Sequence, residues 1–487
     1  MLLDNVVKQM SQEEIVNLAN ELTDAVEKNK FNMLCETGKL KYAHLIAMFL
    51  ATQAMDDGRK LYLYFYKLAM KCGKDRIISK VNNGNKIKIA FLPISASEWQ
   101  AEYIYRKLEN DNRFEVEIVP VPLIGRSKED RTAIYLQTCR FFGSDKYNVK
   151  EIYDTETEEI KGWDEIGGIP DIIVHLTPWY LNIAPSYQIT KLPLNVVNIY
   201  ISYSLSIGNS KTEEWESYRY NQDFLNVMWK VYTETHKDFE GFKKYETLCA
   251  ANVVNSGYIK MDYFYDNHSY TDEQLMSLWS VPKGADIYNY KKILITPHFS
   301  IGNTNALSFS TFDKNMYFFI YLAKKYEGKV SFIFKPHPNL RNSLIINGYM
   351  KSVDDYEKYL DEFRKLPNAS VQEEGDYLAL FDTSDAIIND SISFIGEYMY
   401  VNKPMLFLKR SEQKFNTLGK EVIKAHYSAE GTDYAAIDEF VENVVIDEND
   451  YNKHIREDIF TKELDYYTLN GIKASEYVYK DITSSLF

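Results

Sequence analysis

Cysteine is scarce in this sequence and is not spaced for cross-links or metal binding. The spacing contains no CxxC pair and no other pattern of metal ligands, so neither a zinc knuckle nor a disulfide framework is predicted. Such cysteine usage is typical of an intracellular protein. The four cysteines are Cys35, Cys72, Cys139 and Cys249.

The sequence also lacks the features that direct a chain into or across a membrane. The N-terminal residues show no basic region followed by an apolar core, and no later run of about 18 residues is free of charge. We therefore expect a cytoplasmic protein with neither a signal peptide nor a membrane-spanning helix.

Positive charge is in deficit, which argues against nucleic acid as a partner. Lys and Arg total 56 against 70 Asp and Glu, and the net charge is -14, whereas nucleic-acid-binding domains usually carry a basic surface. The sequence also lacks a GxGxxG motif, so no dinucleotide cofactor is predicted.

What is present is typical of a globular protein with more than one domain. The 487 residues are 45% hydrophobic and 26% charged, enough for two ordinary domains and an appendage. A helical pattern, which opens on Ser11 and Glu14 and includes two more helical stretches in residues 40–72, changes near residue 85. We expect residues 1–84 to form a helical extension packed on the enzyme body; peripheral contact with the inner face of the membrane, or pairing with a partner, is the alternative.

Two series of buried strands follow this extension. Continuous apolar runs separated by helices are typical of parallel sheets covered on both faces. The sequence therefore predicts an α/β protein with two Rossmann-like domains facing across a cleft, at residues 85–283 and 284–487, the second ending in helices from about residue 412. The expected strands lie at residues 86–94, 114–123, 170–178, 194–203, 227–235 and 251–258, and then at 292–298, 330–338, 369–374, 385–391 and 403–408.

Reactive side chains fall at the strand ends of the second series. Ligands of open parallel sheets bind beyond the carboxyl ends of the strands. His298, His337 and Asp390 each end a predicted strand, so we expect them at one edge of the sheet. Because Pro336 and Pro338 restrict the backbone on both sides of His337, its imidazole is rigidly placed.

Cations flank His337 in the sequence. Lys335 and Arg341 lie on either side of it, and two cations beside a fixed imidazole suit phosphate oxygens. The plainer alternative is a histidine that only caps the sheet.

The segment that follows Asp390 is predicted to enter a helix. Its hydroxyls, from Ser391 and Ser393, and its free backbone N–H groups would then form a phosphate seat. Glu397 lies one turn further on, within reach of a ribose diol. Alternatively, Asp390 and Ser391 cap the helix and Glu397 supports its first turn.

The remaining candidates lie in loops. Ser300 and Thr311 belong to a polar, hydroxyl-rich loop after His298 and are candidates for donor binding, although an exposed loop histidine is the alternative. The first series of strands offers fewer candidates, which are Ser95, Trp99, Tyr203 and Ser204.

These strings together resemble the CDP-glycerol glycerophosphotransferases of teichoic-acid and capsule synthesis. The resemblance covers roughly residues 86–430 and is weaker in the first half, where only SASEW, IYISYS and NVVNSGYIKMD look like the acceptor-side domain. The strings that carry it are TPHFSIG (296–302), FSTF (309–312), FKPHPNLR (334–341), SDAIINDSISFIGEY (384–398) and NKPMLFL (402–408).

The resemblance implies a GT-B architecture. It also implies the transfer of glycerol or ribitol phosphate from a CDP-linked donor to a glycan or lipid-linked hydroxyl, with release of CMP. This transfer would need neither a metal ion nor a cofactor. It assigns His298 and His337 to the catalytic centre and the diphosphate, with His298 favoured as the base. It assigns Ser391, Ser393 and Glu397 to donor binding. The chain lacks the family's Trp-His-Gly type acceptor motif, and Ile392 interrupts the usual Ser-Ser pair.

Two other functions fit the same pattern. A helix N-terminus and a ribose-binding glutamate would equally serve a glycosyltransferase that uses a nucleotide sugar. A degenerate, non-catalytic protein that binds glycan or assembles with synthesis enzymes is the third hypothesis, although retention of both histidines counts against it.

Overall fold

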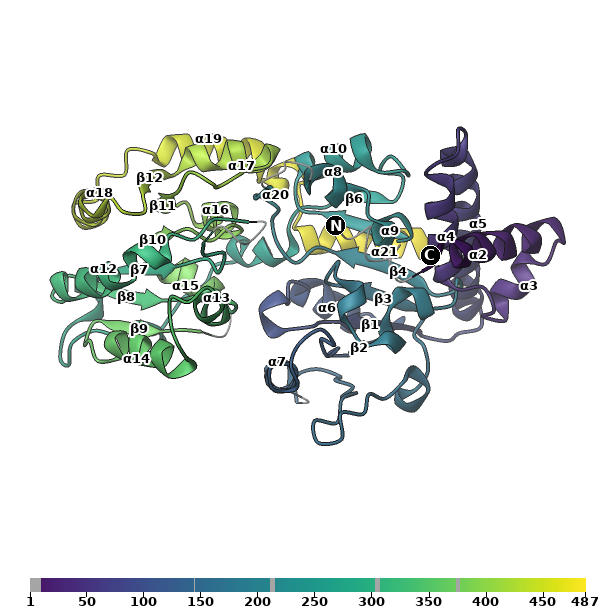
Figure 1. Cartoon of the computed structure of the whole chain (residues 1–487), viewed down its shortest axis with the longest axis horizontal. Helices are drawn as coiled ribbons and strands as arrows, with labels where there is room; N and C mark the ends of the chain where they lie inside the picture. The colour runs from purple at the N-terminus through teal and green to yellow at the C-terminus, as the bar shows by residue number, and fades with distance from the viewer. Residues whose placement is uncertain (1–9, 144, 211–214, 303–306, 374–376) are drawn as a thin grey trace. The chain divides into compact units, whose positions relative to one another are not determined.

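The computed structural model describes residues 10–143, 145–210, 215–302, 307–373 and 377–487. It divides the chain into two compact units. The first unit contains residues 1–203, 217–260 and 469–487, and the second contains 204–216 and 261–468. Figure 1 labels their helices and strands.

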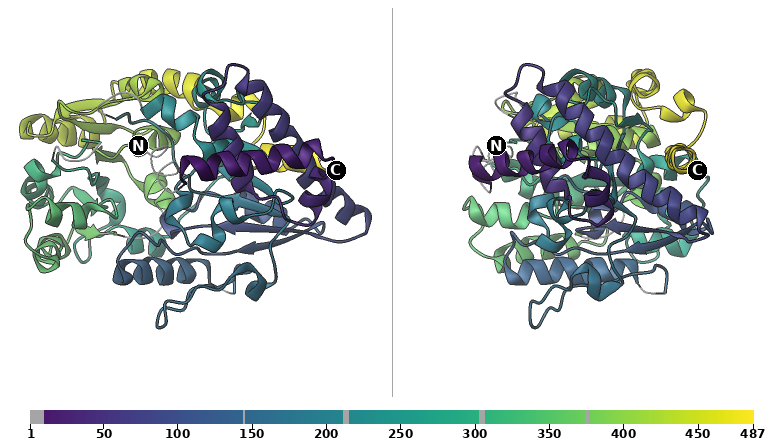
Figure 2. Two further views of the ribbon diagram at one scale, coloured as in Figure 1. Left: turned by 45° about the vertical axis from the view of Figure 1, so that its right-hand side comes forward. Right: turned by 90° about the vertical axis from the view of Figure 1, so that its right-hand side faces the viewer.

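From residue 10 onward, four N-terminal helices belong to the first unit and lie together in the purple part of Figure 2. Ser11 caps the first of them as expected, because the Glu14 N–H donates to Ser11 Oγ at 3.1 Å and the Glu14 carboxylate accepts from the Ser11 N–H. Tyr42 and Tyr62 donate hydrogen bonds to backbone carbonyls of the sheet region, so the expected packing on the enzyme body is confirmed. The helices are α2 (Gln12–Glu27), α3 (Phe31–Glu36), α4 (Tyr42–Thr52) and α5 (Gly58–Asn82).

The absence of cross-links expected from the cysteine spacing is wrong for one pair. Cys35 of α3 and Cys72 of α5 form a disulfide, although 37 residues separate them. Packing of α3 on α5 brings their Cα atoms within 6.6 Å, and sequence spacing carries no information about such a contact. Cys139 and Cys249 are free thiols.

The first unit is built on a six-stranded parallel sheet, which confirms all six strands expected there. The strand order is β2-β1-β3-β4-β5-β6. The order in which successive strands are added to the sheet therefore reverses between β1 and β3, while all strands stay parallel. The strands are β1 (Ile87–Leu92), β2 (Phe114–Ile118), β3 (Ile172–His175), β4 (Val197–Ile201), β5 (Lys230–Thr233) and β6 (Val253–Asn255). Its later helices are α6 (Glu102–Glu109), α7 (Lys128–Phe142), α9 (Asp223–Asn226), α10 (His236–Tyr245) and α21 (Ala474–Leu486).

The C-terminal helix α21 returns to the first unit. It contacts α6 and α5, Glu476 pairs with Lys107 at 2.6 Å, and Asp481 pairs with Lys230 at 3.1 Å. The chain therefore begins and ends its described course in the same unit. Figure 1 shows this yellow helix beside the strands of the first sheet.

The second unit contains a second six-stranded parallel sheet, with the order β12-β11-β10-β7-β8-β9. Two doubly wound α/β sheets with N-terminal helices are thereby confirmed. The strands are β7 (Lys291–Thr296), β8 (Val330–Phe334), β9 (Ala369–Val371), β10 (Ala386–Asn389), β11 (Met405–Lys409) and β12 (Tyr427–Glu430).

The prediction of helices only after residue 412 is wrong at β12. This short strand, of sequence YSAE, pairs only with β11 at the sheet edge and is largely solvent-exposed, so it lacks the apolar run that marks a buried strand. At the other edge β9 ends at Val371, and Glu374 of the expected strand lies outside the described residues.

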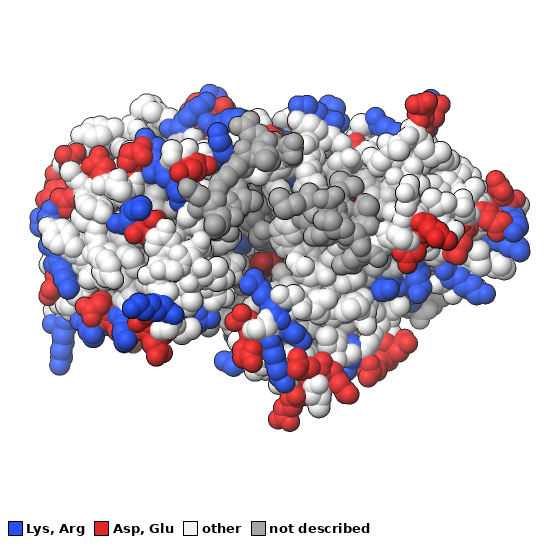
Figure 3. All heavy atoms as spheres, in the orientation of Figure 1, with Lys and Arg blue, Asp and Glu red and all other residues white. Residues whose placement is uncertain are grey.

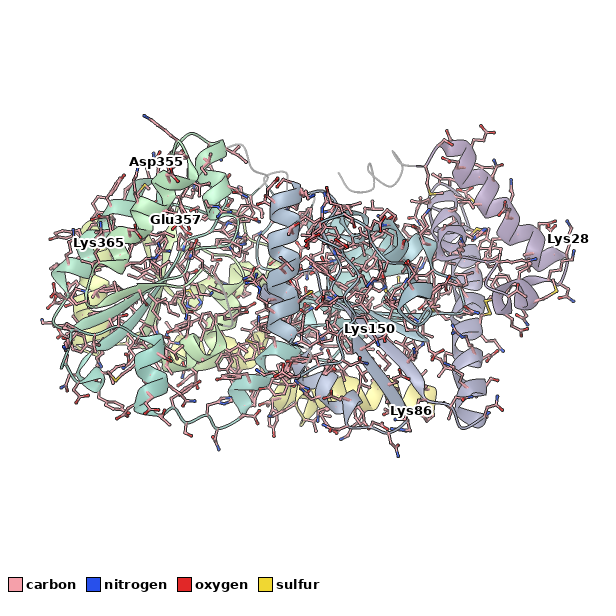
Figure 4. All side chains as sticks on the ribbon, turned by 90° about the horizontal axis from the view of Figure 1, so that it is seen from below. Lys28, Lys86, Lys150, Asp355, Glu357 and Lys365 are labelled. Atoms are coloured by element: carbon pink, nitrogen blue, oxygen red, sulfur yellow. A yellow bond between two sulfur atoms is a disulfide. The ribbon has the colours of Figure 1, made fainter. Side chains whose placement is uncertain are left out.

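The helices of the second unit have one buried apolar face, as helix α14 illustrates. In α14 the side chains of Tyr356, Tyr359, Leu360 and Phe363 are buried at helical spacing. Asp355 and Glu357 of this helix are partly exposed, and Lys365, directly after it, is exposed (Figure 4). The helices are α11 (Asp272–Leu278), α12 (Phe312–Lys325), α13 (Leu340–Ile346), α14 (Val353–Arg364), α15 (Leu378–Thr383), α16 (Phe394–Glu397), α17 (Thr417–Val422), α18 (Tyr434–Glu439) and α19 (Lys453–Glu463), while α8 (Trp215–Tyr220) and α20 (Tyr466–Asn470) span unit boundaries.

The surface is mixed in charge. Lys and Arg side chains are interspersed with Asp and Glu on the face shown in Figure 3. In the described part of the chain no helix is both long enough and apolar enough to cross a membrane.

Candidate active site

The candidate site lies at the carboxyl edge of the second sheet. Numbered from β7, the strand order of this sheet is 3-2-1-4-5-6, which is the Rossmann order, and it reverses between β7 and β10. Ligands of such sheets bind at this switch point. His298 follows β7 and Asp390 follows β10, so both lie where a ligand is expected.

The structure brings the two predicted histidines together. Strands β7 and β8 are neighbours, and their pairing continues past the strand ends, where the His337 N–H donates to the Pro297 carbonyl at 3.1 Å. The imidazole centroids of His298 and His337 are 5.2 Å apart. The ring of Phe299 lies 4.4 Å from one and 4.6 Å from the other, so it forms an apolar wall beside both.

The buried carboxylate of Asp390 holds the His298 loop in place. One oxygen accepts the His298 N–H at 2.6 Å, and the other accepts the Thr311 N–H at 2.6 Å and the Thr311 hydroxyl at 2.9 Å. Asp390 therefore ties β10 to the loop after β7 and to the start of α12. It does not cap the helix after it, as the alternative sequence interpretation proposed.

Both imidazoles use Nδ1 as a hydrogen-bond acceptor. The Ser300 N–H donates to His298 Nδ1 at 3.2 Å, and the Ser300 hydroxyl lies 2.7 Å from the same atom while accepting the Phe309 N–H. The Asn339 N–H donates to His337 Nδ1 at 3.1 Å. An Nδ1 that accepts leaves the proton of a neutral imidazole on Nε2, so each ring has an N–H to offer.

Burial sets the charge of these groups. Burial, with the charge of the neighbouring His337, lowers the pKa of His298 well below 6.5, and burial lowers the pKa of His337 to about 4. Both imidazoles are therefore neutral at pH 7. Burial raises the pKa of Asp390 to about 6, against the hydrogen bonds from Thr311 and His298, so this carboxyl is largely ionised at pH 7.

The expected phosphate seat after Asp390 is short. Helix α16 has four residues and continues as a 3-10 turn at Tyr398–Val401. The Ser391 N–H is already bonded to the Asn389 side chain at 2.9 Å. Glu397 is 1% exposed and accepts a hydrogen bond from the Tyr377 hydroxyl.

The predicted cations lie near the end of β8, in different surroundings. Lys335 is half-buried directly after the strand, and Pro338 is exposed. Arg341 lies on α13, where its charge partly opposes the rise that burial causes in the pKa of Glu373 and of Tyr356. The charge of Arg341 is therefore felt by groups on the β9 side of the sheet, although Arg341 is close to His337 in sequence.

Arg410 is a cation at this edge that the sequence analysis did not identify. It follows β11, beside β10, where its guanidinium donates to the Ser310 carbonyl at 2.9 Å and its charge partly opposes the rise that burial causes in the pKa of Asp390. Its position directly after the apolar string MLFLK was the available signal. Among the described residues, no three His, Cys, Asp or Glu side chains are grouped to hold a metal ion.

Comparisons with known proteins agree with this fold. The family model for CDP-Glycerol:Poly(glycerophosphate) glycerophosphotransferase matches residues 203–484, which is more than half of the chain. The chain belongs to this family. No curated protein matches the sequence.

Solved structures were found that are similar to this chain at low sequence identity. A variant of the wall teichoic acid polymerase TagF is 12% identical with a TM-score of 0.52, over 86% of this chain and 97% of that chain. The UDP-GlcNAc 2-epimerase from Neisseria meningitidis, bound to UDP-GlcNAc, is 14% identical with a TM-score of 0.45, over 76% and 94%. The TagF match supports the GT-B type of architecture.

The candidate residues in the first half of the chain are not brought together as His298 and His337 are. Trp99 is 6% exposed, and its ring packs on Phe142 at 4.9 Å while its N–H donates to Glu102, so it is a core residue. Ser95 lies at the start of a 3-10 turn, 3.1 Å from the Ser97 hydroxyl. The last two candidates are Tyr203, the last residue of its segment of the first unit, and Ser204, which opens a segment of the second.

The lowered pKa of His337 predicts a pH dependence of stability. Because its pKa is about 4 in the folded state and 6.5 as the reference value, the unfolded state takes up this proton first as the pH falls. The free energy of unfolding should therefore fall between pH 6.5 and 4. His337→Asn should remove up to about 1.4 kcal/mol per pH unit of that slope.

Chemical denaturation at a series of pH values measures this slope. His454→Asn, at an exposed histidine of α19, is the matched control and should leave the slope unchanged. Equal slopes for the wild type and His337→Asn would show that burial does not hold His337 neutral.

Proposed function

We propose that this protein transfers glycerol phosphate, or another polyol phosphate, from CDP-glycerol or a related CDP-linked donor. The acceptor is a hydroxyl of a glycan or lipid-linked polymer, and the product is part of a capsule or wall polymer. The pair of neutral imidazoles at the switch point of the second sheet carries this proposal. Membership of the glycerophosphotransferase family supports it.

The reaction requires little covalent chemistry from the protein. The acceptor oxygen bonds to the phosphorus that carries glycerol, the bond from that phosphorus to the bridging oxygen breaks, and CMP leaves with the bonding electrons. Fixed hydrogen-bond donors that neutralise the diphosphate contribute most to such a transfer. We expect the two Nε2–H groups to hold the diphosphate oxygens, without a metal ion.

This assignment changes the role that the sequence favoured for His298. A neutral imidazole whose Nδ1 already accepts a hydrogen bond from Ser300 donates from Nε2 and has no free nitrogen for the acceptor proton. We therefore propose that His298, like His337, is a diphosphate donor and that another group takes the proton.

The other donor-side candidates divide by their contacts. Ser300, Thr311 and Asp390 bond to the His298 loop or to one another, so we propose that they position His298. The remaining candidates, proposed to contact the donor or to support the residues that do, are Lys335, Pro338, Arg341, Ser391, Ser393 and Glu397.

Nucleotide preference tests the proposed donor. A ligand that binds only the folded state raises the melting temperature, so CDP-glycerol and CDP should raise it more than UDP-GlcNAc, UDP or GDP at equal concentration. CMP should then be released from CDP-glycerol when a glycan or polyol acceptor is added. A larger shift with UDP or GDP would favour a nucleotide-sugar glycosyltransferase and contradict the proposal.

Glutamine substitutions test the role of the two histidines. The amide nitrogen of glutamine can replace Nε2–H as a donor but cannot act as a base. We expect His298→Ala and His337→Ala to reduce kcat by about 10²- to 10⁴-fold, and the two glutamine variants to retain clearly more activity.

Steady-state CMP release measures these rates, with His454→Ala as the control. If the glutamine variant of His298 were as inactive as the alanine variant, while still binding CDP-glycerol, the residue would act as the base.

We also propose that the N-terminal helices contact the inner face of the membrane. Large apolar side chains are exposed on or between them, including Met33 at 52%, Met55 at 54% and Tyr64 at 50%. Apolar groups at a helical surface, with nearby lysines such as Lys28, favour an anionic bilayer.

Sedimentation with anionic phospholipid vesicles tests this contact. The full chain should sediment with the vesicles, and Met55→Glu combined with Tyr64→Glu should weaken binding at least tenfold. Tyr317→Glu, at a 73% exposed tyrosine of the second unit, is the control. Failure of the wild type to sediment would contradict membrane contact and leave pairing with a partner as the alternative.

A further inference from the structure

The switch point of the first sheet carries an unused hydrogen-bond acceptor. Gln100 lies in the segment after β1 and is 1% exposed. Its Nε2 donates to the carbonyls of Leu176 and Ile201, just beyond β3 and at the end of β4, at 3.3 and 2.9 Å. These bonds fix the amide, and they leave its Oε1 buried without a partner.

A second unused acceptor lies at the end of the neighbouring strand. Glu234 follows β5 directly and is 4% exposed. The Ser202 hydroxyl, just after β4, hydrogen-bonds its carboxyl, yet Glu234 Oε1 has no partner. Gln100 and Glu234 are thus linked through the consecutive residues Ile201 and Ser202.

A third buried oxygen without a partner lies in the same segment after β1 as Gln100. Glu98 ends the 3-10 turn after β1, and its buried Oε2 has no hydrogen-bond partner. Arg126 and Lys260 lie close enough to lower its pKa, although burial is the larger effect and raises it to about 7. Burial likewise raises the pKa of Glu234 to about 7, with Asp238 adding to the rise and Arg219 opposing it.

We infer that the carboxyl edge of the first sheet binds the hydroxyl groups of the acceptor chain through Glu98, Gln100 and Glu234. The inference rests on the proposed transfer function and names its acceptor side. It replaces Trp99, which is bound in the core, with residues of the same edge that the sequence analysis did not identify.

The chemistry of these atoms selects the class of ligand. The amide oxygen of Gln100 and the ionised forms of Glu98 and Glu234 offer only acceptors, and a buried oxygen without a donor is unfavourable, so a ligand that brings donors is favoured. Hydroxyls of a polyol or glycan bring such donors, so we expect the hydroxyls of an acceptor chain, and not its phosphates, to contact these oxygens. From β1 to β5 there are three strand spacings, or roughly 14 Å, which suits an extended chain.

Glu234→Gln tests the site in the full chain. It should raise the KM for a poly(glycerol phosphate) acceptor, and its Kd in the absence of nucleotide, by about ten- to a hundredfold. The thermal shift with CDP-glycerol and the kcat at saturating acceptor should change little. A neutral maltooligosaccharide is the second probe and shows whether the hydroxyls recognised are those of a glycan or of a polyol phosphate chain.

Glu246→Gln is the matched control. Glu246 is also a buried glutamate of the first unit with one unpartnered oxygen, but it follows α10 and precedes β6, at the amino edge of the sheet. Equal losses in the two variants would show a general effect on folding and overturn the inference.

Hydrogen exchange on the wild type needs no variant. Either probe should protect residues 95–100 and 230–235, and protection elsewhere only, or binding of neither probe, would overturn the site. Both probes are tested without nucleotide. A failure of CDP-glycerol to bind would therefore contradict the proposed function, while the exchange experiment would still show whether the first sheet binds the probes.

Discussion

The carboxylate of Asp390 is the interaction on which the candidate active site depends. It accepts two backbone N–H groups and one hydroxyl, from the loop after β7 and from the start of α12, so three segments distant in sequence share one buried anion. A buried charge is tolerated only when its hydrogen bonds are satisfied. The position of His298 is therefore fixed by the same bonds that keep this carboxylate stable.

The low polarity of the buried site explains why it offers neutral N–H donors, and not charged ones, to an anionic diphosphate. A buried imidazolium would bind a diphosphate more strongly, but burial disfavours that charge in the free protein, as the lowered pKa values of His298 and His337 show. Two Nε2–H groups held by backbone donors at Nδ1 need no reorganisation when the ligand arrives. Lys335 and Arg410 are half-buried at the same edge, where Arg410 pairs with Glu412 at 3.0 Å.

Sequence patterns predicted most of the fold because buried parallel strands are continuous apolar runs. That signal is missing at β12, which is short, polar and at a sheet edge. Sequence spacing likewise carries no signal for the contact of Cys35 with Cys72, which meet only through helix packing. Residues at strand ends, such as His298 and His337, were predictable because topology alone places them at one edge.

Hydrogen-bond direction, by contrast, cannot be predicted from residue types. His298 was favoured as a base from its identity, but the N–H of Ser300 determines which nitrogen holds the proton, and that depends on loop conformation. Trp99 seemed available to a ligand because it follows a strand, whereas its ring fills a core pocket of aromatic side chains.

The two sheets thus present opposite hydrogen-bonding chemistry at their carboxyl edges. The second offers N–H donors, which suit the oxygens of a diphosphate, and the first offers the unpartnered oxygens of Gln100 and Glu234, which suit hydroxyls. The protons of hydroxyls find acceptors at the first edge, and the oxygens of a diphosphate find N–H donors at the second. This opposition gives a physical reason for a transferase to keep its donor and its acceptor on separate sheets.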